Sequence, residues 1–150
     1  MKLVTVRTTA MAPSGEAVAH FERDGARRAV LVRGGAPDET VRARLDDTSR
    51  PARGDIVEIV EPSPGRETAA CPFVAACGGC DWMHLSRDAQ ASAHVALAEG
   101  AFPGVPVAFH EAPSALAYRA RARIHARRGR LGFFGARSHD VVRVDACVVL

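Results

Sequence analysis

Four cysteines are the residues of this chain with the clearest capacity for chemistry. Cys71, Cys77 and Cys80 lie within ten residues, in the segment CPFVAACGGC, and Cys147 follows much later. Four thiolates are the complete ligand set of a cubane [4Fe–4S] cluster, and closely spaced ligands with one remote partner are usual for such sites. The pattern therefore predicts that these four side chains hold an iron–sulfur cluster.

Other uses of four cysteines remain to be weighed against the cluster. Structural zinc also takes four cysteines, but often as two Cys-x-x-Cys pairs, and this chain has one such pair. Disulfides are disfavoured in a cytosolic chain, and unligated cysteines would not explain such close spacing. Gly78 and Gly79 suit a backbone that bends tightly around a metal centre. Zinc stays open as the alternative.

Arginines gather in the same part of the chain as the last cysteine. Residues 111–150 carry eight arginines and three acidic side chains, a net charge of +5, whereas residues 1–110 have a net charge of −2. Such asymmetry indicates an anionic partner. Guanidinium groups bind phosphates bidentately, so the expected partner is RNA. The predicted RNA-binding residues are Arg119, Arg121, Arg123, Arg127, Arg128, Arg130 and Arg137, together with Trp82 as a base-stacking platform.

A strand over Tyr118–Arg127 would place Arg119, Arg121 and Arg123 on one face, because alternate residues of a strand share a face. The plain alternative is a solvated sheet face. For Phe133 and Phe134 core packing is favoured over base stacking, and for Trp82 the two are evenly balanced. His84 and His139 are as readily surface polarity as contacts to a cluster or to RNA.

The first sixty residues predict a small barrel. Candidate strands are Lys2–Thr9, Glu16–Arg23, Ala29–Arg33, Thr40–Asp46 and Arg53–Pro62, and Asp24-Gly25 is a strong hairpin signal. Five short strands separated by Gly, Pro and Asp turns are typical of a closed barrel of the OB type. A small β-domain without any nucleic-acid role is the alternative.

The break Pro62–Gly65 divides the chain into residues 1–62 and a second part, 63–150. Ser86 is expected to cap a helix that runs to about Glu99 and ends at Gly100. Strands are expected at 104–111, Tyr118–Arg127, Arg130–Gly135 and Val141–Val149. The predicted fold class is mainly β, an OB-like barrel followed by an α+β part with one helix and an antiparallel sheet.

Composition and the distribution of apolar residues exclude some classes of protein. The chain is 47% hydrophobic but only 5% aromatic, so small units packed on Ala, Val and Leu are expected. No apolar run approaches the roughly 20 residues needed to span a bilayer, and the N-terminus has no secretory h-region. A cytoplasmic, monomeric protein with no membrane partner is the expectation.

Two segments together resemble a known family. Cys71–His84, CPFVAACGGCDWMH, and Tyr118–Leu150, YRARARIHARRGRLGFFGARSHDVVRVDACVVL, resemble consecutive blocks of the bacterial RNA uracil-5-methyltransferases that modify 23S ribosomal RNA. The first sixty residues resemble the TRAM domain, an OB-like RNA-binding barrel, with Gly15–Ala19 and Glu61–Arg66 at its characteristic turns. The resemblance covers essentially the whole chain and implies that Cys147 is the fourth cluster ligand.

The resemblance also implies what lies outside these residues. In the family a Rossmann-like domain follows, with the S-adenosyl-L-methionine (SAM) site, a nucleophilic cysteine and a general base. All four cysteines here are assigned to the cluster, so no catalytic residue is expected and SAM belongs to the missing catalytic domain. The chain is expected to be the RNA-binding and [4Fe–4S]-binding N-terminal part of an RNA (uracil-5-)-methyltransferase, inactive alone, acting on 23S rRNA, with tRNA as the other candidate.

Two other classes of function stay open at this point. One is a stand-alone iron–sulfur module that binds nucleic acid without an enzyme attached. The other is a small electron-transfer protein, which would have no use for the arginines. The cluster itself is interpreted as structural, in preference to redox sensing.

Overall fold

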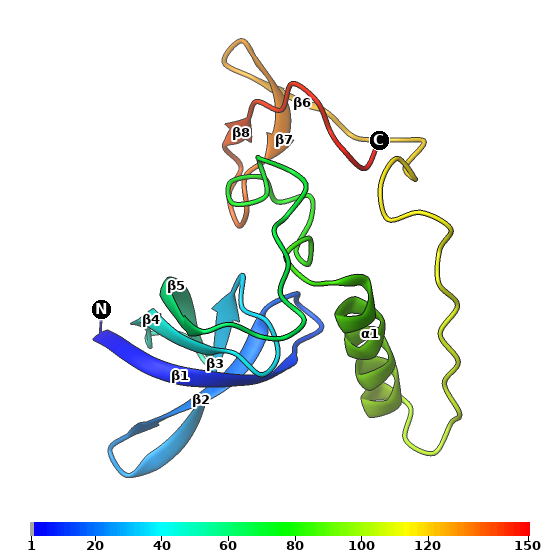
Figure 1. Ribbon diagram of the computed structural model, residues 1–150. Helices are drawn as coiled ribbons and strands as arrows, with labels where there is room; N and C mark the ends of the chain where they lie inside the picture. Colours follow the sequence, from blue (N-terminus) through cyan, green and yellow to red (C-terminus); the bar gives the residue numbers. More distant parts are fainter. Residues whose placement is uncertain (1) are drawn as a thin grey trace. The chain divides into compact units, whose positions relative to one another are not determined.

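The computed structural model describes residues 2–150 and forms two compact units (Figure 1). The first, here called the barrel unit, contains the residues up to Glu67 together with His84–Phe109. The second, here called the cysteine unit, contains Thr68–Met83 and His110–Leu150. The chain therefore passes between the units three times, and the helix belongs with the barrel.

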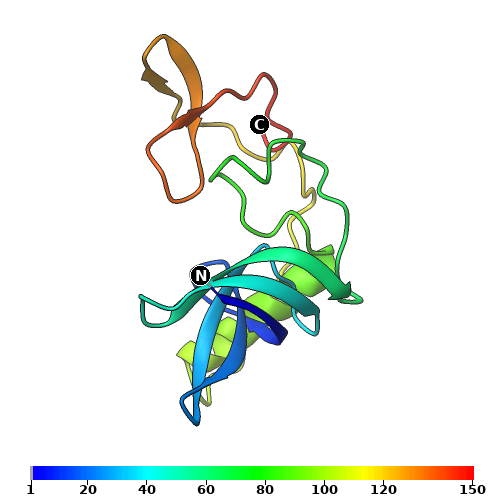
Figure 2. The same cartoon turned by 90° about the vertical axis from the view of Figure 1, so that its left-hand side faces the viewer.

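Five strands close the barrel, as the sequence predicts. They are β1 (Lys2–Met11), β2 (Ala17–Arg23), β3 (Ala26–Arg33), β4 (Thr40–Asp46) and β5 (Ala52–Glu61). Their order around the barrel is β1-β2-β3-β5-β4, with β3 and β5 parallel and the other pairs antiparallel (Figures 1 and 2). The predicted OB-like architecture is confirmed.

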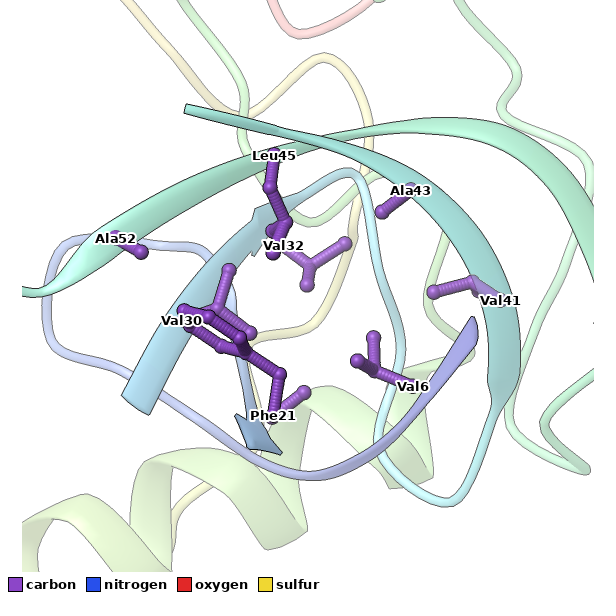
Figure 3. Close-up of a cluster of buried hydrophobic side chains, with 9 residues drawn as sticks. Val6, Phe21, Val30, Val32, Val41, Ala43, Leu45 and Ala52 are labelled. Carbon is purple, nitrogen blue, oxygen red and sulfur yellow. The ribbon is translucent and has the colours of Figure 1, made fainter. Parts of the chain in front are cut away.

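Alternation of small apolar and polar side chains builds the barrel interior. In β4 the side chains of Val41, Ala43 and Leu45 are buried, whereas Arg42 and Arg44 between them are exposed. This is the period of two that a strand with one buried face requires. The same pattern in neighbouring strands yields one core (Figure 3), which consists of Val6, Ala19, Phe21, Val30, Val32, Val41, Ala43, Leu45 and Ala52. Phe21 is its one aromatic member.

The hairpin between β2 and β3 forms where Asp24-Gly25 predicts it. Arg23 pairs with Ala26, which leaves a two-residue turn. Asp24 has φ 52° and Gly25 has φ 72°. Positive φ at both central residues is the signature of a type I′ turn, whose twist matches that of the flanking strands.

One helix, α1 (Arg87–Ala101), contacts β1. Its start is confirmed, because the Ser86 hydroxyl oxygen accepts a hydrogen bond from the Ala89 N–H at 3.2 Å and Asp88 lies in the first turn. The helix extends slightly further than the predicted end at Gly100. The Phe102 N–H still donates to the Ala98 carbonyl at 2.9 Å, so the helix continues through Ala101.

The cysteine unit has less strand than predicted. It contains β6 (His125–Arg127), β7 (Arg130–Phe134) and β8 (Val141–Val142), antiparallel and in the order β6-β7-β8. The turn at Gly129, with φ 73°, and the strand after it are confirmed. Within residues 2–150, however, no strand covers 104–111, 118–124 or 143–149, so those predictions are wrong.

The missing strands have a physical reason. A strand persists only where a neighbour accepts and donates its ladder hydrogen bonds. The N–H groups of Ala117 and Arg119 donate instead to the carbonyls of Val148 and Val149, at 2.9 and 2.8 Å. Ala117 also has a positive φ of 52°, which takes the chain out of the extended conformation. Short irregular pairing thus replaces the expected ladder.

Candidate cysteine site and basic segment

All four cysteines line one cavity, which lies within the cysteine unit and measures about 50 Å³. A water molecule needs about 10–15 Å³ of such volume, so the cavity is larger than one water molecule requires. The rest of the lining comes from the same segments and is apolar apart from Arg119. Besides Arg119 and Gly79 it consists of Phe73, Val74, Met83, Phe133, Val144, Val148 and Val149.

Hydrogen bonds to the β7–β8 hairpin hold the loop that carries three of the cysteines. Cys77 pairs with Gly135 as an isolated bridge. The Gly78 N–H donates to the Phe134 carbonyl at 2.9 Å, and the Ala136 N–H donates to the Ala76 carbonyl at 3.1 Å. The loop is therefore positioned by the end of β7.

Gly78 is needed for close approach, a reason different from the tight bend that the sequence suggests. Neither Gly78 nor Gly79 has a positive φ. A Cβ atom added at Gly78 would lie 3.2 Å from backbone atoms of both Gly135 and Ala136. A side chain at this position would therefore push the cysteine loop away from the hairpin.

The remote Cys147 reaches the cavity through a turn at the end of the described chain. The Leu150 N–H donates to the Cys147 carbonyl at 3.1 Å. The bonds from Ala117 to Val148 and from Arg119 to Val149 secure the two residues that follow Cys147. Residues 117–119 therefore bring the fourth thiol next to the other three.

The Cys80 thiol lies within electrostatic range of the other three cysteines and of Arg119. Burial raises the pKa of the Cys80 thiol, nearby Arg119 lowers it, and Cys147, Cys77 and Cys71 raise it. All four cysteines are free of disulfides. Among residues 2–150, no three His, Cys, Asp or Glu side chains converge closely enough to hold a single metal ion. The four cysteines line one cavity, and a donor set of four thiols is one that a [4Fe–4S] cluster takes.

The predicted RNA-binding arginines are exposed, but they do not form the expected face. Arg119, Arg121 and Arg123 lie in a segment without strand structure, so the argument from strand alternation is wrong for them. Arg119 lines the cysteine cavity, and Arg121 and Arg123 do not. The rest of the set, also exposed, is Arg127, Arg128, Arg130 and Arg137, and Trp82 is half-buried.

Aromatic and histidine side chains take mainly structural positions. Phe134 stacks on His125, with ring centroids 3.7 Å apart, and meets the edge of His139 at 5.1 Å. Phe133 lines the cysteine cavity. His84 is buried in the barrel unit, where its Nε2–H donates to the Gly35 carbonyl at 2.9 Å, so surface polarity is the wrong interpretation for it.

Sequence reasoning missed the apolar lining of the cavity and the position of Arg119. Val144, Val148 and Val149 flank Cys147 within three residues, and that valine enrichment was the available signal. For Arg119 the alternation of arginine with apolar residues gave no signal, because Arg121 and Arg123 belong to the same alternation.

Comparison with known proteins identifies relatives for most of the chain. No protein-family profile matches it. The 23S rRNA (uracil(1939)-C(5))-methyltransferase RlmD of Marinomonas sp. (strain MWYL1) is 32% identical over 133 aligned positions, covering 82% of this chain and 30% of the relative. The protein of the same name from Shewanella sp. (strain ANA-3) is 34% identical over 140 positions, with 82% and 30% covered.

A third relative extends over nearly the whole chain. An uncharacterized RNA methyltransferase of Gloeobacter violaceus is 34% identical over 159 aligned positions, covering 97% of this chain and 34% of the relative. This chain is homologous to the N-terminal part of bacterial RNA methyltransferases. The resemblance noted in the sequence is confirmed, and the chain spans about a third of the length of the relatives it matches. None of the described helices is long and apolar enough to cross a membrane.

Proposed function

We propose that this chain is the RNA-binding and [4Fe–4S]-binding N-terminal portion of a SAM-dependent RNA (uracil-5-)-methyltransferase that acts on 23S rRNA. One observation carries the proposal: in a homologue of RNA methyltransferases, three closely spaced cysteines and one that is remote in sequence line a single cavity. Two of the relatives act, by name, on uracil 1939 of 23S rRNA.

In this proposal Cys71, Cys77, Cys80 and Cys147 are the four cluster ligands. When bound, the cluster joins the loop at 71–80 to the segment around Cys147 and stabilises a unit that has little regular structure of its own. Metal-binding free energy of this kind becomes folding free energy, because the unfolded chain has no preformed site. The apolar lining limits access of water to the sulfurs.

RNA binding is assigned to the predicted arginines of the cysteine unit that lie outside the cysteine cavity, and to the barrel, which we take to be a TRAM domain. Guanidinium groups that are exposed can approach phosphates without first losing a buried partner. Each neutralised phosphate releases counterions, so the affinity should fall steeply with salt.

The whole enzyme, as the family resemblance implies, adds a cysteine thiolate to C6 of uracil, methylates C5 from SAM and then removes the C5 proton. The four cysteines described here are assigned to the cluster, so the nucleophile is placed in another part of the enzyme. Taking the target base out of its stack costs a few kcal/mol. RNA contacts made by these residues would offset that cost.

The metal content tests the cluster assignment. Protein purified without oxygen should contain about four irons and four acid-labile sulfides per chain, with the visible absorption of a cubane cluster. Cys80→Ser should lower the iron content, and the exposed Arg130→Gln serves as the matched control in the same unit. Stoichiometric zinc in place of iron and sulfide would overturn the assignment.

A salt series tests the RNA assignment. Binding of a 23S rRNA fragment around the target uridine to the cluster-loaded chain is measured by fluorescence anisotropy. Arg123→Gln should weaken binding and reduce the log–log salt slope by about 1, as loss of one phosphate contact does. Arg143→Gln, an exposed arginine paired with Asp145 at 2.7 Å, is the control. No RNA binding by the unaltered chain at low salt would refute this part of the proposal.

A further inference from the structure

Arg119 occupies a position that its neighbouring arginines do not share. Within residues 2–150, it is the one residue of charged type among those that line the cysteine cavity, whose other members are the four cysteines, a glycine and apolar residues. Arg121 and Arg123 continue the same alternation with apolar residues but lie outside that lining. The tertiary structure therefore separates residues that the sequence treats alike.

Local contacts hold Arg119 at this place. Its N–H donates to the Val149 carbonyl at 2.8 Å, two residues after Cys147. Its guanidinium carbon lies 5.6 Å from the centroid of the Tyr118 ring, within the range of a cation–π interaction. The backbone hydrogen bond thus fixes Arg119 beside the segment that carries Cys147.

We propose that Arg119 compensates the negative charge of the cluster bound by the four cysteines, and that it is not a phosphate contact. This inference rests on the proposed cluster. A cubane cluster with four thiolates is a net anion, and net charge is one of the properties that set its potential. Arg119 thus favours cluster retention and favours the reduced, more negative state.

Paired variants separate this role from RNA binding. Arg119→Gln and Arg121→Gln are prepared without oxygen as full chains and compared with the unaltered protein. The midpoint potential is measured by titration with dithionite, which supplies the electron, and the rate of cluster loss is measured with an iron chelator. RNA anisotropy against salt is recorded for the same samples.

The two glutamine variants are expected to differ in their effects on the cluster. Arg119→Gln should lower the midpoint potential and give several-fold faster cluster loss while the salt slope of RNA binding stays unchanged. Arg121→Gln should leave potential and cluster loss unchanged. Arg119→Lys, which keeps the positive charge, should recover most of the potential.

Three results would overturn the inference. The first is an unaltered potential and rate of cluster loss in Arg119→Gln. The second is a reduced RNA salt slope in that variant. The third is loss of the cluster from both the Gln and Lys variants, which would indicate a packing role instead of a charge. Failure of the proposed function would be seen separately, as absence of iron and sulfide from the unaltered chain.

Discussion

Replacing Arg66 by methionine should strongly destabilise the barrel unit. Arg66 is paired with Glu39, whose side chain is completely buried, while that of Arg66 is 18% exposed. Its guanidinium donates to Glu39 Oε2 at 2.8 Å and to the Gly34 carbonyl at 2.7 Å. Methionine keeps the apolar stem but leaves the Glu39 carboxylate buried without its cation.

The size of the effect follows from the burial of the pair. Removing one partner of a buried ion pair costs about 3–5 kcal/mol, because an uncompensated charge stays inside the protein. After the substitution Glu39 retains weaker backbone donors, the N–H groups of Ala36 at 3.2 Å and Ser63 at 3.4 Å. We expect the free energy of unfolding of the barrel unit to fall by about 3–5 kcal/mol.

Arg42→Met is the matched control. Arg42 Nη1 lies 2.8 Å from Glu58 Oε2, a distance equal to the one in the buried pair, but the two side chains are 46% and 51% exposed. Exposed pairs of this kind contribute about 0–1 kcal/mol. The comparison therefore isolates burial as the cause.

Urea unfolding of the full chain, followed by far-UV circular dichroism, measures the effect. Amide hydrogen exchange locates it in the barrel, through the N–H of Thr8, which donates to the Glu39 carbonyl at 2.8 Å, and that of Asp38, which donates to Thr8 at 3.1 Å. The double variant Glu39→Gln/Arg66→Met should recover part of the loss, since no lone charge remains. Equal losses for Arg66→Met and Arg42→Met would refute the reasoning.

Three further changes test the packing of both units. Leu45→Ala, at a core position 2% exposed, should lower the free energy of unfolding by about 2.7–5 kcal/mol in urea titrations. Ser86→Ala removes the cap of α1 and should cost about 1 kcal/mol, with a matching loss of helical dichroism on heating. Gly132→Ala places a Cβ 1.9 Å from the Val142 carbonyl oxygen, so it should abolish pairing of β7 with β8 and lower the iron content. Gly100→Ala, where a Cβ meets nothing within 4 Å, should leave the iron content unchanged and so serves as its control.

The barrel was predictable because its burial follows the chain directly. In β4 the alternation of Val41, Ala43 and Leu45 with arginines predicts both the strand and the face that is buried. Asp24-Gly25 predicts the turn between β2 and β3. The cap of α1 at Ser86 was equally predictable from the local sequence. The strand expected over 118–124 failed because alternation of Ala and Arg does not supply a ladder partner, and no local feature shows that residues 117–119 bond to 148–149.

The sequence by itself determined the type of chemistry available: four thiols in a three-plus-one spacing and a C-terminal excess of arginine, both of which are written in residue type and order. Only the tertiary structure decided which charges act on which partners. Glu39 pairs with Arg66, which lies 27 residues further along the sequence. Arg119, unlike Arg121, lines the cavity of the four cysteines, and its backbone N–H bonds to the Val149 carbonyl. The interaction of a charge depends on its distance from the partner and on the polarity around it, and both are set by contacts between segments far apart in the chain.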